Sequence, residues 1–163
     1  LTALVGGNRT TGSAFILEDV ATEVTRLAPM GVDIKEIFKQ HNYRDDTLFG
    51  HALDGNFHLA FSQEFKTQSD IDQYKSMMDD LCHLVANKYD GSLKAEHGTG
   101  RNIAPFIEME WGSKAYEIMW DIKNLFDPKG ILNPGVILNR DKTVHIQNIK
   151  PLTPVHPVID KCI

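Results

Sequence analysis

Two histidines that flank an Asp-Gly pair are the first residues in this sequence whose types and spacing could bind a metal. The segment GHALDGNFH carries His51 and His58 on either side of Asp54 and Gly55. Asp-Gly favours a two-residue type I′ turn, because both central residues of that turn need a positive φ. The resulting hairpin would pair His51 with His58, with Cβ atoms roughly 4.5–5.5 Å apart. Both imidazoles would then be able to reach one metal ion.

A third ligand would separate this interpretation from a simpler one, in which two half-exposed histidines only hydrogen-bond to their neighbours. Two imidazoles seldom hold a divalent ion without a carboxylate or a thiolate. The segment KAEHGTGR supplies a carboxylate at Glu96, beside His97 and two glycines that allow close backbone approach. His51, His58 and Glu96 would form a His₂Glu site with open positions, which is typical of a catalytic metal.

The composition indicates a soluble, globular chain of one domain. Its 163 residues are 42% hydrophobic and 24% charged, which is ordinary for a folded protein. The formal net charge is −5 and no basic run occurs, so nucleic acid is not expected as a partner. No apolar run approaches the roughly 18 residues of a membrane span. Cys82 and Cys162 make no disulfide framework, which favours a reducing cytoplasm, and Cys82 is expected to be buried.

The pattern of apolar residues predicts an α+β fold, with helices packed on one face of an antiparallel sheet. Strands are expected at 14–19, 47–53 and 56–64. Helices are expected at 21–41, with a break at Pro29 and Gly31, at 69–90, with Ser69 as the N-cap, and at 112–126. The chain is expected to divide into a domain at 1–138 and a proline-rich, extended tail at 139–163.

Three motifs together make the chain similar to a known family. GHALDGNFH, AEHGTGR and FDPKGILNPG occur in the order and spacing of the C-terminal substrate domain of FAD-linked oxidases, over roughly Ala14 to Leu138. That family includes the D-lactate, glycolate and D-2-hydroxyglutarate dehydrogenases of the vanillyl-alcohol oxidase superfamily. The resemblance implies an FAD-dependent dehydrogenase of a D-2-hydroxy acid, of the D-lactate or D-2-hydroxyglutarate class. A divalent metal (Zn, Mn or Fe) would bind the substrate hydroxyl and carboxylate.

The resemblance also assigns roles to individual residues. It makes His51, His58 and Glu96 the metal ligands, and His97 the base that accepts the substrate proton. Asn56 would support the site and contact the substrate. Asn133, in LNPG, would lie near the flavin cofactor.

Two arginines are candidates for binding the substrate carboxylate. Arg9 and Arg101 would do so through bidentate hydrogen bonds, although each is equally well an ordinary surface arginine. Lys94 is expected to be solvated. Leu53 and Ala60 depart from the family pattern. The family has a glycine in place of Leu53, and often a polar residue in place of Ala60. Both departures leave the ligands in place and put the shape of the substrate pocket in question.

The end of the chain resembles a bacterial subgroup of large fused enzymes. In that subgroup DKCI opens a cysteine-rich region, so Cys162 is expected to be the first ligand of a 4Fe-4S cluster rather than a lone surface thiol. Because the chain has no initiator Met and ends abruptly, we expect it to be a fragment. No glycine fingerprint for a dinucleotide is present.

FAD is therefore expected in a missing N-terminal FAD-binding domain of the same polypeptide, and the fragment alone is expected to be inactive. The full-length protein would pass electrons to an acceptor and lie in the cytoplasm or at the inner membrane. Two other classes stay open. The His₂Glu set would also suit a self-contained metallohydrolase, and the domain would also suit a non-catalytic assembly module.

Overall fold

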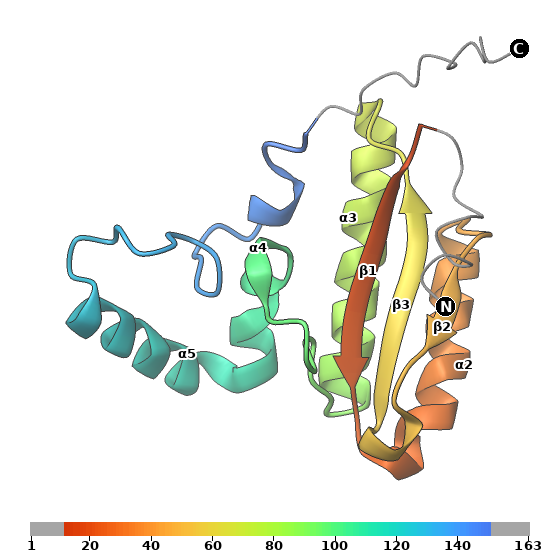
Figure 1. Cartoon of the computed structure of the whole chain (residues 1–163), viewed down its shortest axis with the longest axis horizontal. Helices are drawn as coiled ribbons and strands as arrows, with labels where there is room; N and C mark the ends of the chain where they lie inside the picture. The colour runs from red at the N-terminus through yellow and green to blue at the C-terminus, as the bar shows by residue number, and fades with distance from the viewer. Residues whose placement is uncertain (1–11, 151–163) are drawn as a thin grey trace, which may run out of the picture.

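A three-stranded antiparallel sheet forms the centre of the molecule. The computed structural model describes residues 12–150, so Arg9 and Cys162 lie outside the described residues. The strands are β1 (Ala14–Ala21), β2 (Thr47–Phe49) and β3 (Asn56–Gln63), in the spatial order β1-β3-β2 (Figure 1). The antiparallel pairing of the strands, with helices beside them, confirms the predicted α+β class.

Two helices cover one face of this sheet and enclose the core. α2 (Val24–Gln40) and α3 (Gln68–His83) lie behind the strands in Figure 1. Because side chains alternate along a strand, Leu59 and Phe61 of β3 face these helices, whereas His58 faces away from them. The core contains Met30, Ile34, Met77, Met78, Leu81 and the predicted buried thiol of Cys82.

α2 runs without a break through Pro29, so the predicted interruption is wrong. The helix loses one backbone hydrogen bond at Pro29, but the buried side chains of its inner face hold it against the sheet. Gly31 also has a different role from the predicted one. A Cβ at Gly31 would lie 2.9 Å from Cε2 of Phe57 on β3, so the glycine lets the helix approach the sheet closely.

The connection between β2 and β3 is longer than the predicted two-residue turn. β2 ends at Phe49, which pairs with His58, so the predicted pairing of His51 with His58 is wrong. Residues 52–54 form a 3₁₀ helix, which ends at Gly55 in the left-handed region (φ 66°). The carbonyl oxygen of Gly55 accepts a hydrogen bond from the N–H of Thr22 at 2.9 Å. The turn is thus attached to the end of β1, and this tertiary contact overrides the local preference of Asp-Gly.

The second half of the described chain begins with α3, which packs on the sheet, and the helices after it lie beside the sheet. Thr67, not Ser69, caps α3 in a reciprocal capping box with Asp70. A π-helical turn (Leu84–Lys88) extends α3, and α4 (Gly100–Ile103) and α5 (Ile107–Phe126) follow. Gly112 interrupts α5 with non-helical angles (φ 78°, ψ 157°), as the predicted helix start at 112 implies.

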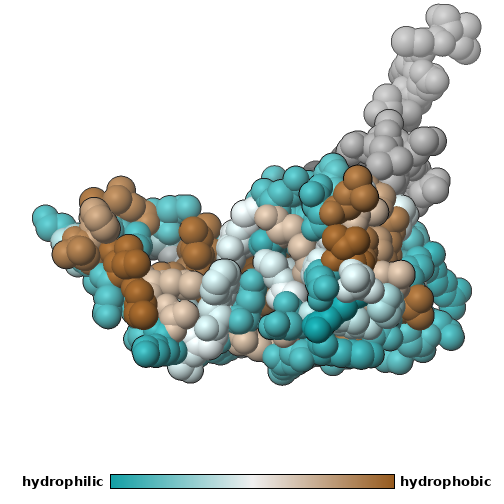
Figure 2. Space-filling view, turned by 90° about the horizontal axis from the view of Figure 1, so that it is seen from below, coloured by the Kyte–Doolittle hydropathy of each residue, from teal (hydrophilic) through white to brown (hydrophobic). Residues whose placement is uncertain are grey.

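The part of α5 after Gly112 and the loop that follows form a lobe beside the sheet domain. Figure 2 shows apolar side chains gathered on this lobe, which is on the left of the view. The exposed apolar side chains of the lobe are Ile118, Ile122, Leu125, Phe126, Ile131, Leu132 and Ile137. Within residues 12–150, no helix has both the length and the apolar character needed to cross a membrane.

Residues 139–150 pack against the domain instead of extending from it. A short 3₁₀ helix (Val144–Ile146) buries Val144 and His145. The ring of His145 lies beside Phe106 and Tyr74, with centroids 5.3 Å and 6.4 Å away. Both ring nitrogens of His145 are buried and have no hydrogen-bond partner among the described residues. The division of the chain at residue 138 stays a prediction.

The buried His145 should make the folded state sensitive to acid. Burial lowers the pKa of His145 below its ordinary value of 6.5, against the opposing effect of Asp79. The unfolded chain therefore binds a proton more readily, and stability is lost as the pH falls below about 6.5. The free energy of unfolding, measured with urea between about pH 7 and pH 5, should fall less steeply in His145→Phe than in the wild type. Equal slopes in the two proteins would contradict this assignment.

Gly55 should not tolerate a side chain. A Cβ there would overlap the carbonyl oxygen of Thr22, in addition to the strain of φ 66°. Gly55→Ala should therefore lower the free energy of unfolding by more than about 1 kcal/mol. Gly130→Ala is the matched control, because Gly130 has a similar φ of 61° and no atom lies within 4 Å of the place that a Cβ would take there. A loss in Gly55→Ala no larger than that in the control would show that the contact with Thr22 is unimportant.

Candidate metal centre

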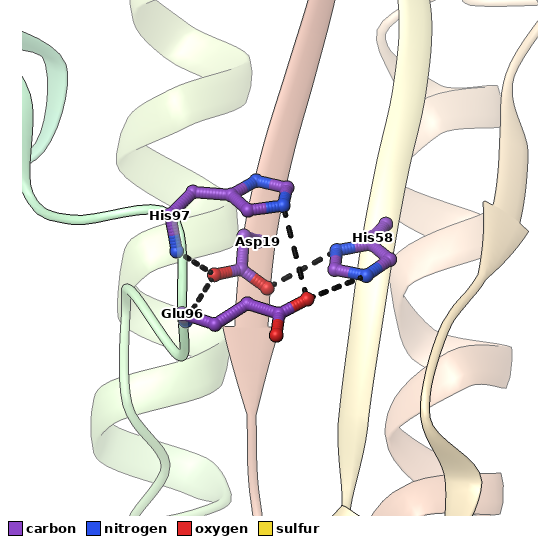
Figure 3. A group of neighbouring side chains, drawn as sticks. All are labelled: Asp19, His58, Glu96 and His97. Carbon is purple, nitrogen blue, oxygen red and sulfur yellow. Dashed lines mark hydrogen bonds and ion pairs between the residues drawn. The ribbon is translucent and has the colours of Figure 1, made fainter. Parts of the chain in front are cut away.

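The side chains of the candidate site come from three separate segments. His51 lies in the loop after β2, His58 lies on β3, and Glu96 and His97 lie in the loop that precedes α4. Figure 3 shows that the last three gather around Asp19 of β1. The site is therefore on the sheet face opposite α2 and α3.

The carboxylate of Glu96 lies where the three predicted ligands meet. Its Oε1 atom is 3.3 Å from Nε2 of His51 and 3.1 Å from Nε2 of His58. The two imidazole rings are nearly perpendicular, with centroids 5.4 Å apart. The loop after β2 brings His51 back toward the strand, so the three side chains converge even though the predicted hairpin register is wrong.

Asp19 supports this arrangement from the sheet side, and sequence reasoning missed it. Its side chain is fully buried, and its Oδ2 atom accepts hydrogen bonds from the backbone N–H groups of Glu96 (2.6 Å) and His97 (2.9 Å). Its Oδ1 atom accepts a hydrogen bond from the amide of Asn56 at 2.6 Å. Oδ1 also lies 3.2 Å from Nδ1 of His58.

The contact with Asp19 sets which nitrogen of His58 faces the site. Nδ1 of His58 is buried and makes no hydrogen bond to a described residue, but the carboxylate of Asp19 lies 3.2 Å from it. This orientation directs Nε2 toward Glu96. A carboxylate behind a histidine is the usual arrangement at metal sites, where it fixes the ring and its tautomer.

The carboxyl group of Asp19 stays ionised in spite of its burial. Burial raises its pKa, but the hydrogen bonds from Glu96, His97 and Asn56 outweigh that effect, and the net pKa is below the ordinary value. A permanent negative charge therefore lies behind His58. Such a charge strengthens an imidazole as a metal ligand.

His97 lies beside the three ligands and is open to solvent on one side. Its ring stacks on that of His58, with centroids 4.7 Å apart and an angle of 2° between the planes. Its Nε2 atom is 3.9 Å from Oε1 of Glu96, and 35% of the side chain is exposed. His97 can therefore meet a molecule that enters from solvent, while its backbone stays attached to Asp19.

The other predicted site residues lie in different surroundings. Asn56 is buried and uses its amide group on Asp19 and on the carbonyl oxygen of Val20. Arg101 is exposed and donates a hydrogen bond to the carbonyl oxygen of Val144. Asn133 is exposed in the loop after α5, with a positive φ of 44°. No interaction joins Arg101 or Asn133 to the three ligands among the described residues.

Lys94 was predicted to be solvated, and this prediction is wrong. Its side chain is only 10% exposed and forms an ion pair with Glu18 of β1 at 2.5 Å. The sequence does carry a signal for this pair and for Asp19, because Glu18 and Asp19 interrupt the apolar run of a buried strand. Buried charges require partners, but only the fold shows which partners they have.

The donor atoms of the site suit a divalent cation. Two imidazole nitrogens lie within 3.3 Å of one carboxylate oxygen of Glu96, and the buried carboxylate of Asp19 stands behind the imidazole of His58. Ligand atoms of Asp19, His58, Glu96 and His97 also lie within 4.8 Å of one another. Imidazole and carboxylate ligands suit Zn²⁺, Mn²⁺ or Fe²⁺. His58 and Glu96 belong both to this group and to the predicted ligand set, whereas His51 reaches only Glu96 of this group, at 3.3 Å.

Comparison with known proteins identifies several similar chains. The chain is 30% identical over 126 residues to the glycolate oxidase subunit of Bacillus subtilis, and 32% identical over 122 residues to a D-2-hydroxyglutarate dehydrogenase of Stutzerimonas stutzeri. It is 28% identical over 119 residues to a D-lactate dehydrogenase of Anaerostipes hadrus. These alignments cover 77%, 73% and 73% of this chain, but only 26%, 26% and 25% of the relatives.

The family comparison covers nearly the whole of the described domain. Residues 3–137 match the family described as FAD linked oxidases, C-terminal domain. All three motifs on which the resemblance rests lie within this range. The match includes the strand and the loops that carry the candidate ligands. The chain therefore belongs to the FAD-linked oxidases, as their C-terminal domain.

Proposed function

We propose that this chain is the substrate-binding and metal-binding part of an FAD-dependent dehydrogenase that oxidises a D-2-hydroxy acid. The observation that carries the proposal is that Oε1 of Glu96 lies 3.3 Å from Nε2 of His51 and 3.1 Å from Nε2 of His58, beside the accessible ring of His97. The names of three relatives support the substrate class, because glycolate, D-lactate and D-2-hydroxyglutarate are all 2-hydroxy acids. The chain spans about a quarter of these relatives, so the activity is proposed for the full-length protein.

Oxidation of a 2-hydroxy acid removes a proton from the hydroxyl oxygen and a hydride from the carbon that bears it. A bound divalent ion would lower the pKa of the hydroxyl group, and a bound flavin would take up the hydride. His97 would accept the hydroxyl proton at Nε2, since this ring is partly exposed and borders the ligands. Asp19 would hold the backbone of His97 in place during this transfer.

The remaining roles are proposals for the full-length protein. Arg9 and Arg101 are the candidates for binding the substrate carboxylate, and Asn133 for contact with FAD. Asn56 is better placed to position Asp19 than to touch a substrate. Cys162 would ligate a 4Fe-4S cluster that passes electrons to an acceptor, in a cytoplasmic protein or one peripheral to the inner membrane.

The substrate and the metal can be tested together in the full-length protein that contains this chain. Addition of the correct D-2-hydroxy acid should bleach the flavin absorbance, and treatment with a chelator should abolish the bleaching. Bleaching should also be lost in His51→Ala and Glu96→Ala, and should slow by about 10²–10⁴-fold in His97→Ala.

His83→Ala is the matched control for these variants, because His83 is an exposed histidine at the end of α3. This variant should bleach at the wild-type rate. Normal bleaching in His51→Ala and Glu96→Ala would show that a metal at this site takes no part in the reaction. Metal-dependent hydrolysis by this chain without any flavoprotein would favour the metallohydrolase class instead.

Replacement of Asp19 should weaken metal binding while it leaves the predicted ligands His51, His58 and Glu96 in place. Asp19→Asn places amide hydrogens against groups that already donate hydrogen bonds, so His58 and the Glu96 loop lose their orientation. The dissociation constant for Zn²⁺, measured by calorimetry on this chain, should rise by about 10–100-fold. The free energy of unfolding should fall by about 1–3 kcal/mol. Asp72→Asn, on the exposed face of α3, is the control, and wild-type affinity in Asp19→Asn would contradict the assignment.

A further inference from the structure

A buried ion pair lies on the opposite side of β1 from the metal ligands. Nζ of Lys94 is 2.5 Å from Oε2 of Glu18, and the two side chains are only 10% and 6% exposed. The other carboxylate oxygen of Glu18 accepts a hydrogen bond from the amide of Asn102. The hydroxyl group of Tyr74, on α3, donates to Asn102 at 2.8 Å. Every charged group of this cluster therefore has a partner, and the cluster joins β1, α3 and α4.

Both residues of the ion pair are close in sequence to residues of the candidate site. Glu18 directly precedes Asp19 on β1, and Lys94 is two residues before Glu96 in the loop. Glu18 and Asp19 are consecutive on β1, so their side chains point to opposite faces of the sheet. Lys94 binds Glu18 on the helix side, and the backbone N–H groups of Glu96 and His97 bind Asp19 on the site side. The loop from Lys94 to His97 thus crosses the edge of β1 and is held on both faces.

The chain just before this loop is also held to β1, and the chain after it is next held to β1 at Asn102, beyond two glycines. Ala21 and Ser92 exchange two backbone hydrogen bonds, at 3.0 Å and 2.8 Å. Beyond His97, Gly98 and Gly100 have positive φ angles, and no atom lies within 4 Å of where a Cβ would be. Lys94 is the last side chain before Glu96 that binds β1. Its position therefore sets where the carboxylate of Glu96 lies relative to His51 and His58.

We propose that Lys94 is a positioning residue for the metal centre, and that its ion pair with Glu18 fixes the loop in the single register in which Glu96 meets His51 and His58. A slip of the loop by one residue would separate two buried charges and leave both without a partner, which is strongly unfavourable. This inference rests on the proposed function for the role of the metal. The register of the loop itself does not depend on a metal.

The test compares the wild-type chain with Glu18→Gln/Lys94→Met, a double variant that leaves no unpaired buried charge. The amide hydrogens of Glu96 and His97 should exchange with solvent at least about tenfold faster in the double variant, because their hydrogen bonds to Asp19 open more often. The dissociation constant for Co²⁺ should rise by about 10–100-fold. The visible absorption bands of bound Co²⁺ should also change, since they report the ligand geometry.

Lys123→Met/Asp127→Asn is the matched control, because it removes another ion pair of 2.5 Å with a buried carboxylate, at the end of α5. Circular dichroism should show that both double variants are folded, and the control should keep the exchange rates and the Co²⁺ spectrum of the wild type. If Glu18→Gln/Lys94→Met does not fold, the single variant Lys94→Arg replaces it, with the same exchange and Co²⁺ readouts.

The outcomes separate this inference from the proposed function. Wild-type exchange rates in a folded double variant would overturn the role of Lys94, whatever the metal does. Absence of Co²⁺ binding by the wild type, with slow exchange at Glu96 and His97, would instead refute the metal centre of the proposed function. Faster exchange in the double variant would support the register role in either case.

Discussion

The structure depends on the burial of one carboxylate, that of Asp19, on the edge strand β1 of the sheet. A buried charge is tolerated only where hydrogen bonds replace the water that it has lost. Asp19 obtains them from Asn56 on β3 and from the backbone of Glu96 and His97. The same requirement therefore brings two segments, about forty residues apart in the sequence, to one end of β1. The candidate site is formed where they meet, close to the groups that donate hydrogen bonds to Asp19.

The sequence predicted which side chains lie together better than the geometry that brings them together. Residue type and motif were sufficient to select His51, His58 and Glu96, which are neighbours in the structure, because few side chains bind divalent ions. Their role as ligands stays a prediction. The two-residue turn failed because the preference of Asp-Gly is local, whereas Gly55 is held against Thr22 of a distant segment. The interruption of α2 failed for a similar reason, since the contact of Gly31 with Phe57 is tertiary.

The supporting residues were harder to predict than the ligands. Asp19 and Lys94 are of types that are mostly exposed in proteins, and the position of Asp19 in an apolar strand shows that it needs partners without showing which ones. Their burial depends on partners far along the chain, namely His58 and Glu96 for Asp19, and Glu18 for Lys94. By contrast, the helix face that contains Met77, Met78 and Cys82 follows from the spacing of apolar residues alone, and it is buried. Periodic burial was thus predictable, whereas isolated buried charges were not.

The site is asymmetric in its access to solvent. The side chain of His58 is 7% exposed, whereas those of His51 and Glu96 are 58% and 51% exposed. One side of the candidate site is therefore buried, and the other is open to solvent. A buried inner side suits the orientation of reacting groups, and an open outer side leaves room for a substrate under the proposed function.

Gly112 gives the chain a sharp bend, after which the rest of α5 leaves the sheet domain (Figure 1). The helix beyond the bend carries Leu125 and Phe126 with more than three quarters of each residue in contact with water. Exposed apolar area of this kind favours association between molecules, so the solubility of the chain does not follow from its folding stability. A preparation of this chain can thus be fully folded and still aggregate as its concentration rises, and detergents or salts that act on that helix would change its colloidal behaviour without any effect on the ligand set.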